Sequence, residues 1–228
     1  MKLLVVGSKG QIGSAIVEVL SDTYEVSGVD IGTPTPSQSF DIMHVAIPYT
    51  QDFVEIVTRY EDQYQPGAVV IHSTVPVGTC DPHGWVHAPI RGRHPNLVGG
   101  VKTFPLHVGG VKAQRVASVF EQCGVTTITH DRSTTTEAGK LWELAQLGIQ
   151  VRVSHEIHDY CQQHGLDYSE VYTMFAETYN TGYSQLEPQF VRPVLEYMPG
   201  PLGGHCVAQN SPLLYSEFVD RLLSPITP

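Results

Sequence analysis

The sequence predicts an α/β fold: a parallel sheet covered by helices, followed by an all-helical part with one long central helix. Two observations carry this prediction. In the first half of the chain, short β-branched runs alternate with amphipathic segments. After position 134 these runs give way to segments with helical periodicity. Strands that alternate with helices form parallel sheets with right-handed crossovers.

Four apolar runs in the first half have the length and composition of buried parallel strands. They are Leu3–Val6, Glu25–Val29, Met43–Ile47 and Ala68–His72. Helical periodicity predicts helices over Gln11–Leu20, Gln51–Tyr64 and Lys112–Gln122, and a further strand follows at Val125–Thr129.

The connection between the second and third strands is unusually short. About a dozen residues, including a Thr-Pro-Thr-Pro stretch, separate Asp30 from the Met43 strand. A strand-plus-helix crossover needs more chain than this, so we expect a loop and a trimmed sheet.

A glycine-rich loop follows the first strand and opens the first helix. Its spacing, Gly7-x-x-Gly10-x-x-Gly13, allows a tight turn, close backbone approach and helix–strand packing, and Ser8 stands where the commoner fingerprint has glycine. Asp30 ends the second strand, where a carboxylate binds a ribose 2′-hydroxyl and favours NAD over NADP. The sheet is therefore of Rossmann type, although the glycines could also serve a tight turn alone. The predicted cofactor-binding residues here are Gly7, Ser8, Gly10, Gln11, Ile12, Gly13 and Asp30.

The second part of the chain is expected to be helical throughout. One long helix of roughly 28 residues is predicted within Thr135–Gly165, and shorter helices over Asp167–Tyr179, Val191–Met198 and Pro212–Leu223. We therefore expect an NAD-binding domain at residues 1–133 and a helical substrate or dimerisation domain at residues 134–228.

Composition excludes several classes of partner. The chain has 228 residues and a formal net charge of −10, which argues against nucleic acid and anionic membranes as partners. No apolar run is long enough to span a bilayer. The four cysteines are scattered without a C-x-x-C pair, so free thiols and a cytoplasmic location are expected.

The segment Pro201-Leu-Gly-Gly-His-Cys206 places one cysteine in a glycine-rich turn. A thiol held there can face the reactive end of a bound cofactor, which suggests a dehydrogenase with a cysteine nucleophile.

Four segments, in order along the chain, resemble motifs of the UDP-glucose and UDP-N-acetylmannosamine dehydrogenases. His44–Pro48 resembles the strand end beneath the nicotinamide, and Ser73–Thr79 resembles the S-T-V-P-x-G segment. Glu137–Lys140 resembles the E-x-x-K that opens the long helix, and Pro201–Cys206 resembles the G-G-x-C segment. The chain is thus similar to the nucleotide-sugar dehydrogenases, within the 6-phosphogluconate dehydrogenase-like superfamily.

The resemblance implies an NAD-dependent enzyme with defined catalytic roles. Cys206 would attack an aldehyde intermediate to give a thiohemiacetal, and a second hydride transfer would give a thioester that water hydrolyses. Lys140 would stabilise the oxyanion, and Thr74 would hydrogen-bond water or substrate. Ile47, Pro48 and Ser73 would bind the cofactor. Related proteins dimerise through the long helix, so the resemblance also implies a homodimer.

The sequence departs from the family at several polar positions. Leu144 stands where the family has asparagine, and Gln209 and Asn210 replace the residues that follow its cysteine motif. The family's nucleotide-binding second α/β domain is expected to be missing. Three alternatives follow: a dehydrogenase acting on a small alcohol or sugar-type substrate, an NAD-binding but inactive subunit or relic, and a two-electron β-hydroxyacid-type reductase that uses Lys140 alone.

Three further residues are candidate substrate ligands. Arg91 and Arg93 form a possible anion clamp or else belong to a solvated loop, and Asn180 lies in an aromatic segment that could line a pocket or form a packing core. His83, His87 and His94 are close in sequence, but their alternating spacing and missing acidic partners predict no metal site.

Overall fold

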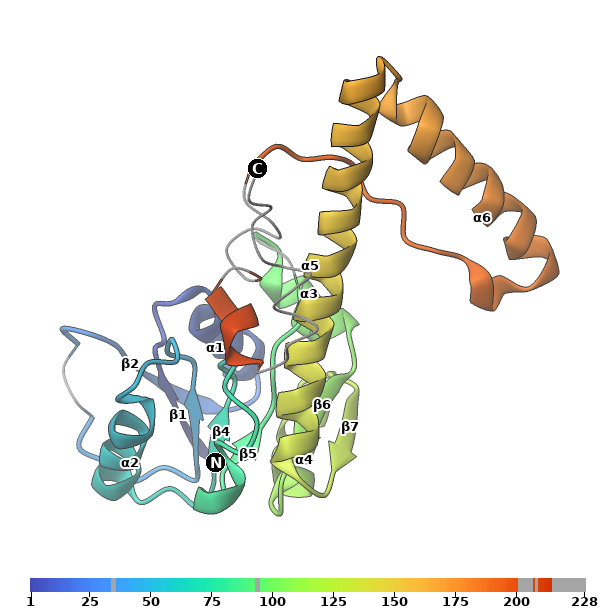
Figure 1. Cartoon of the computed structure of the whole chain (residues 1–228). Helices are drawn as coiled ribbons and strands as arrows, with labels where there is room; N and C mark the ends of the chain where they lie inside the picture. Colours follow the sequence, from blue (N-terminus) through green and yellow to red (C-terminus); the bar gives the residue numbers. More distant parts are fainter. Residues whose placement is uncertain (34–35, 93–94, 201–206, 208, 215–228) are drawn as a thin grey trace. The chain divides into compact units, whose positions relative to one another are not determined.

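The computed structural model describes residues 1–33, 36–92, 95–200, 207 and 209–214. Within them, seven strands form one sheet in the order β2-β1-β3-β4-β5-β6-β7 (Figure 1). The strands are β1 (Lys2–Val6), β2 (Glu25–Val29), β3 (Ile42–Val45), β4 (Val69–Ile71), β5 (Val86–His87), β6 (Leu106–Gly109) and β7 (Thr127–His130). All neighbouring pairs are parallel except β5 with β6. The predicted parallel α/β sheet is confirmed.

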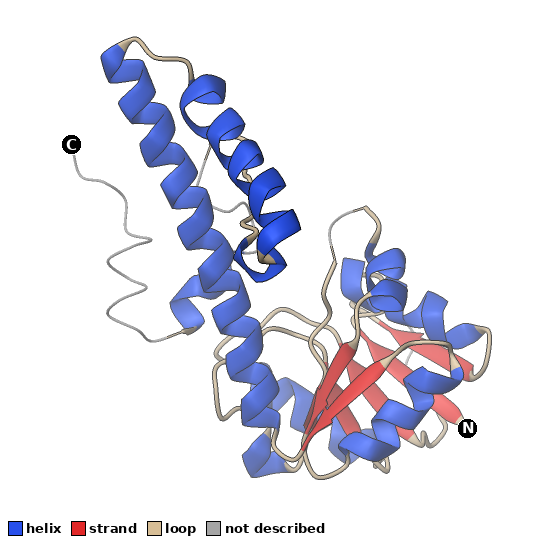
Figure 2. Ribbon diagram, turned by 90° about the vertical axis from the view of Figure 1, so that its right-hand side faces the viewer, coloured by secondary structure: helices blue, strands red, loops and turns tan. Residues whose placement is uncertain are grey.

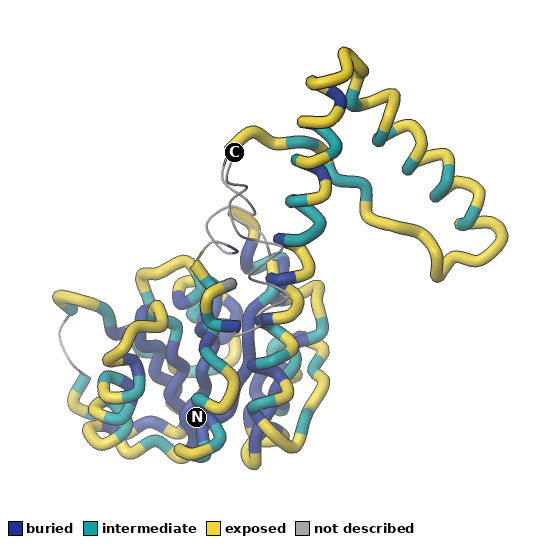
Figure 3. The backbone as a smooth tube through the Cα atoms, in the orientation of Figure 1, coloured by how far each residue is buried: buried dark blue, intermediate teal, exposed yellow. Residues whose placement is uncertain are grey.

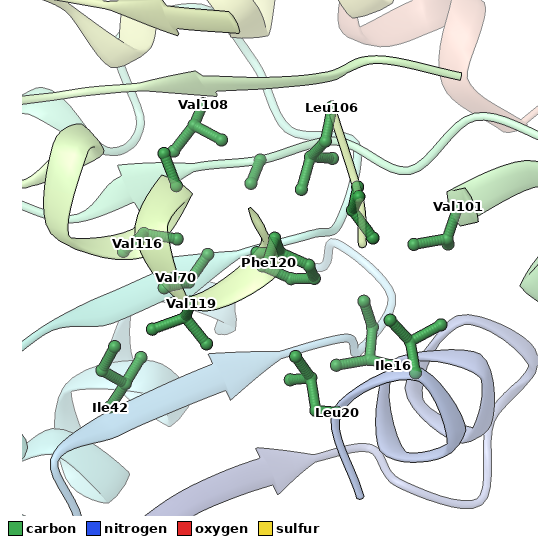
Figure 4. Packing of buried hydrophobic residues seen from close by; sticks show 14 of the residues in the cluster. Ile16, Leu20, Ile42, Val70, Val101, Leu106, Val108, Val116, Val119 and Phe120 are labelled. Carbon is green, nitrogen blue, oxygen red and sulfur yellow. The ribbon is translucent and has the colours of Figure 1, made fainter. Parts of the chain in front are cut away.

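Helices cover both faces of the sheet (Figure 2). They are α1 (Gln11–Ser21), α2 (Phe53–Tyr64), α3 (Leu97–Thr103) and α4 (Ala113–Gln122). Residues of α1, α3 and α4 share one buried cluster with the sheet, in which Ile16, Val101 and Phe120 pack against strand residues such as Val70 (Figure 4). Residues of α2 join a second cluster on the other face, with Phe53 and Val57 fully buried.

The trimmed crossover is confirmed by the strand order. β2 and β3 lie on opposite sides of β1, and the chain passes from Val29 to Ile42 without a helix or strand between them in the described part of that stretch. The strand order therefore reverses between β1 and β3. Ligands of open α/β sheets bind at the carboxyl ends of the strands where this reversal occurs.

Three elements are absent from the sequence prediction: β5, α3 and β6. β5 has two residues, and the short α3 contains two glycines, Gly99 and Gly100. β5 and α3 carry too few residues for a periodic pattern to be recognised, and in β6 the apolar run is interrupted by His107.

The long helix is confirmed as α5 (Ser133–His164), which has 32 residues. The chain divides into two compact units within this helix, Met1–Leu141 and Trp142–Pro228, called unit 1 and unit 2 below. In unit 2, α5 is followed by a π-helical turn η2 (Ser169–Thr173), α6 (Met174–Leu186) and a short turn η3 (Pro188–Phe190). Within the described residues, no helix combines the length and apolarity that crossing a bilayer requires.

The predicted helix over Val191–Met198 is wrong, because this segment has no regular secondary structure. Its backbone is hydrogen-bonded to side chains instead. Asn180 accepts from the Arg192 N–H and donates to the Arg192 carbonyl, at 2.9 and 2.7 Å. Tyr172 and Tyr168 bind the N–H and carbonyl of Leu195. Pro193 has no N–H to give to a helix. Of the predicted helix Pro212–Leu223, the described part contributes to a 3₁₀ turn at Ser211–Leu213, and the rest lies outside the described residues.

Candidate dinucleotide-binding site

The loop between β1 and α1 has a backbone that only glycine fits at two positions. Gly7 has a φ of +81°, and a Cβ there would lie 2.5 Å from the Ala46 carbonyl oxygen. A Cβ on Gly13 would lie 2.0 Å from the Gly7 carbonyl oxygen. Both neighbours are backbone atoms that cannot rotate away, so the loop, β3 and α1 pack at van der Waals distance.

The first turn of α1 is open to a ligand at its N-terminus. Gly10 is the N-cap and provides no side-chain cap. The first N–H groups of a helix have no intrahelical partner, and together with the helix dipole they attract a phosphate. The predicted residues Gln11, Ile12 and Gly13 form this turn.

Asp30 is fixed against the glycine loop. One carboxylate oxygen accepts the Lys9 N–H at 2.7 Å, and the other accepts the Ile31 N–H at 2.8 Å. This places a carboxylate at the end of β2, beside the loop that would hold a pyrophosphate. Each carboxylate oxygen has a second lone pair, which is the acceptor that a ribose hydroxyl requires. The glycine cradle and this carboxylate fit NAD.

Ser8 is tolerated at a fingerprint glycine position for a local reason. Among the described residues, Gln65 is the only non-glycine with a positive φ, so Ser8 has an ordinary backbone conformation. Its side chain lies over β2, where a Cβ on Gly28 would come within 2.6 Å of the Ser8 hydroxyl oxygen. Gly28 therefore makes the space that Ser8 occupies.

The ends of β3 and β4 are tied together beside this loop. The Ser73 hydroxyl donates to the Ile47 carbonyl at 2.6 Å, which joins two of the predicted cofactor-binding segments. Pro48 is exposed and Thr74 is half-buried. The structure thus brings Ile47, Pro48, Ser73 and Thr74 to one edge of the sheet, the edge at which β1 enters the glycine loop.

Glu137 organises the segment that follows β4, and the sequence analysis gave it no role of its own. Its buried carboxylate accepts the N–H groups of Gly78 and Cys80 at 2.6 and 2.8 Å. Burial and the Glu137 charge raise the pKa of the Cys80 thiol, so this cysteine is held neutral. The sequence carries no signal for this role, because the burial of Glu137 is visible only in the structure, where a buried carboxylate requires partners.

The predicted catalytic residues are only partly placed. Lys140 is half-buried on α5, one turn after Glu137, and its charge is among the causes that lower the pKa of the buried His87. Cys206 lies outside the described residues.

Two of the three predicted substrate ligands, Arg91 and Asn180, have protein partners. The Arg91 guanidinium donates to the Pro105 carbonyl at 2.9 Å and lies over the Phe104 ring. Asn180 in unit 2 uses both ends of its side-chain amide on Arg192. Arg93 lies outside the described residues, and the substrate roles of all three stay predictions.

The histidines at 83 and 87 have separate environments. His83 is exposed and stacks on Trp85, whereas His87 is buried and bonds to Ser73 and Thr136. His94 is not among the described residues. In the part of the chain that the structure describes, no three His, Cys, Asp or Glu side chains are grouped to hold a metal ion.

No family model and no curated protein matches this sequence. Solved structures do match the fold. The UDP-D-ManNAc dehydrogenase of Pyrococcus horikoshii superposes with a TM-score of 0.76 at 18% identity, over 98% of this chain and 68% of that one. The UDP-N-acetyl-mannosamine dehydrogenase of Staphylococcus aureus gives 0.67 at 20%, over 98% and 66%. The NDP-N-acetyl-D-galactosaminuronic acid dehydrogenase of Methanosarcina mazei gives 0.68 at 17%, over 100% and 62%.

The strand order, the glycine loop and the long helix therefore define the fold of a Rossmann-type dehydrogenase. More particularly, the fold is that of the nucleotide-sugar dehydrogenases, as the resemblance in sequence predicted. This chain spans about two thirds of the length of those structures.

Proposed function

We propose that this chain is an NAD-dependent oxidoreductase that oxidises an alcohol group of a small or sugar-type substrate. The observation that carries the proposal is the Asp30 carboxylate, fixed by the Lys9 N–H against a loop that admits only glycine at positions 7 and 13. The nucleotide-sugar dehydrogenase fold supports the same activity class.

The residues of this chain would divide the work between binding and chemistry. NAD, when bound, supplies a hydride acceptor. The α1 N-terminus would hold the pyrophosphate, Asp30 the adenosine ribose, and the Ile47–Pro48 and Ser73–Thr74 segments the nicotinamide half. Lys140 would stabilise developing negative charge on the substrate oxygen, and Cys206 would be the nucleophile in a two-step oxidation. Arg91, Arg93 and Asn180 stay candidates for holding the substrate.

We also propose that the protein is a cytoplasmic homodimer. Unit 2 exposes large apolar side chains, among them Phe175 at 74% and Leu186 at 78%. Large apolar side chains gathered on one element mark contact surfaces. Analytical ultracentrifugation tests this proposal, and a concentration-independent monomer would contradict it.

Thermal unfolding with NAD⁺, NADH, NADP⁺ and NADPH tests the cofactor directly. At a hundredfold excess over the dissociation constant, a ligand that binds only the folded state stabilises it by about 2.7 kcal/mol. We expect this shift with the NAD pair and not with the NADP pair. Asp30→Ala should remove most of it, and Asp131→Ala, at an exposed acidic residue, should leave it unchanged. The absence of a shift with all four nucleotides would contradict an NAD-dependent enzyme.

One observation favours a second candidate, an NAD-binding subunit without catalysis. Leu144 is apolar and buried at the position where the resemblance in sequence implies a polar asparagine. Turnover assays with alcohols, sugars, nucleotide sugars and hydroxyacids separate the two candidates. Cys206→Ala then separates mechanisms: loss of turnover supports the cysteine route, whereas preserved turnover leaves Lys140 as the main acid–base group.

A further inference from the structure

The neighbouring strands β4 and β5 pair over a short stretch of backbone, and the boundary between these two strands is called the seam below. Two residue pairs join these strands, Val70 with Val86 and Ile71 with His87. On its other side β5 meets the antiparallel β6 through a single pair, His87 with Gly109. The segment that begins at Ser73 leaves the sheet at this seam, so the ladder alone gives its start little support.

Two buried histidines cross the seam in opposite directions. The Nδ1 atom of His72, the residue directly after β4, lies 2.6 Å from the Ala88 carbonyl oxygen, which follows β5. The Nε2 atom of His87, on β5, lies 3.2 Å from the Ser73 carbonyl oxygen, which follows β4. A carbonyl can only accept, so each imidazole donates its N–H across the seam. These two bonds extend the pairing of β4 and β5 beyond the backbone ladder.

The proton of His87 is assigned by the Ser73 carbonyl, which can only accept. The Thr136 hydroxyl oxygen lies 2.9 Å from the His87 Nδ1. The same hydroxyl lies 2.9 Å from the Ser133 carbonyl oxygen and 3.3 Å from the His87 carbonyl oxygen, so it has other acceptors and does not by itself fix the ring tautomer. The Ser73 carbonyl fixes it, because a neutral ring bonds to this acceptor only with its single proton on Nε2. The opposite tautomer would set the Nε2 lone pair against the lone pairs of the Ser73 oxygen in a buried place, which is unfavourable. Burial lowers the pKa of His87 to about 3, so the ring is neutral at physiological pH and has only one proton to place.

The same turn of α5 holds the other end of the segment. Thr136 faces His87, and the adjacent Glu137 accepts the N–H groups of Gly78 and Cys80. Just beyond, the Asp81 carboxylate accepts the Ser133 N–H at the start of α5, at 3.0 Å. The segment is therefore held by buried polar contacts at both of its ends.

We infer that His87 is a positioning residue, which holds the Ser73 peptide so that Ser73 and Thr74 face the nicotinamide half of the bound dinucleotide. This inference rests on the proposed function. The Ser73 hydroxyl is already committed to Ile47, so the orientation of its peptide depends on the bond to its carbonyl. His87 acts through this peptide and does not touch the cofactor.

Two substitutions separate positioning from folding. His87→Phe keeps a planar ring and removes the donor, whereas His87→Gln keeps an N–H that can reach the place of Nε2. We expect His87→Phe to weaken NAD⁺ binding about tenfold, because the Ser73 carbonyl loses its hydrogen-bond donor. The binding of ADP-ribose, which lacks the nicotinamide, should change by no more than about twofold, because the Ser73 peptide faces only the nicotinamide half of the dinucleotide. His87→Gln should recover most of the loss. His83→Phe, at an exposed histidine of the same unit, should change neither affinity. Isothermal titration calorimetry measures all of these affinities.

The outcomes distinguish this inference from the proposed function. If the wild-type protein binds neither ligand, the proposed function fails and the role of His87 falls with it. If the wild-type protein binds both, but His87→Phe weakens both equally, the cofactor site stands and the positioning role is overturned.

A measurement on the wild-type protein covers the case in which His87→Phe does not fold. ¹⁵N NMR of the imidazole should show the proton on Nε2 of His87. A proton on Nδ1 would overturn the inference, because the ring could then not donate to Ser73. Thr136→Val, which removes only the hydroxyl, should shift the Nδ1 resonance and leave the Nε2–H signal in place.

Discussion

The two units of this chain are stabilised in different ways. In unit 1 the interior consists of two apolar clusters, one on each face of the sheet, and its helices contribute fully buried side chains (Figure 3). In unit 2, α6 has no buried residue, and its large apolar side chains are exposed. What fixes the chain after α6 is a set of polar contacts to Arg192 and Leu195.

This difference predicts how each unit responds to change. Because unit 1 is closely packed, its free energy of unfolding should fall when a single atom is added to the interior or when a buried group becomes charged. A dense interior cannot relax around either change. In unit 2 the segment after α6 is held by four hydrogen bonds, two exposed and two part-buried, and each contributes modestly. Unit 2 also leaves apolar surface for a partner, which is consistent with the proposed dimer.

The largest effect is expected from an added methyl group in the glycine loop. Gly13→Ala places a Cβ against the Gly7 carbonyl oxygen, so we expect a loss of about 3 kcal/mol in the free energy of unfolding. Gly139→Ala is the matched control, because its Cβ meets no atom within 4 Å on α5. That change should stabilise the protein by up to about 1 kcal/mol. Urea unfolding measures both, and a neutral Gly13→Ala would contradict the tight packing of the loop.

The next effect is loss of stability in acid. Burial lowers the pKa of His44, His72 and His87, the last two to about 4 and about 3. Between these values and the ordinary pKa of about 6.5, the unfolded chain binds protons that the folded chain does not. Stability is therefore complete above about pH 6.5 and falls as the pH is lowered, by about tenfold in the folding equilibrium per pH unit for each histidine.

Urea titrations between pH 7 and pH 5 test this dependence before most carboxylates titrate. His87→Gln should reduce the proton uptake on unfolding by about one. A stability that does not change between pH 7 and pH 5 would contradict the burial of three neutral histidines.

The sequence predicted the first four strands, the trimmed crossover and the long helix because each has a strong local signal. The glycine spacing and Asp30 predict a cofactor site because they follow a known spacing, and this role stays a prediction. The contact of Asp30 with the Lys9 N–H joins residues that are distant in sequence, so only the structure shows it. The prediction of a helix over Val191–Met198 is wrong because its backbone partners, Asn180 and two tyrosines, lie earlier in the chain. His87 and Glu137 were missed as site-organising residues for a similar reason, because their partners are carbonyl and N–H groups that a sequence pattern does not specify.

A smaller and more local effect is expected at the polar contacts of unit 2. Asn180→Ala removes both bonds to Arg192, and Asn180→Asp keeps the acceptor for the Arg192 N–H and loses the donor. We expect losses of about 1–2 kcal/mol for alanine and about half of that for aspartate. Hydrogen exchange followed by mass spectrometry should show faster exchange around residues 187–198 and no change in the strands of unit 1. Equal acceleration in both units would show that the two are not stabilised separately.

The smallest effect is expected at Gly28 of β2, which packs against Ser8 of the glycine loop in unit 1. Gly28→Ala sets a Cβ 2.6 Å from the Ser8 hydroxyl oxygen and 2.8 Å from the Ser8 Cβ. The hydroxyl can rotate, but the Cβ is relieved only by a small shift of the loop, so the cost should be about 1 kcal/mol. Ser8→Gly removes the obstacle, and the double variant should recover most of the stability and of the NAD⁺ affinity. Contacting residues are non-additive in this way, whereas independent ones are additive. Additive losses in the double-mutant cycle would mean that Gly28 is required for a reason other than the space that Ser8 occupies. A positive coupling energy between positions 8 and 28 would show that serine fits in the glycine loop because the neighbouring strand β2 has glycine at position 28.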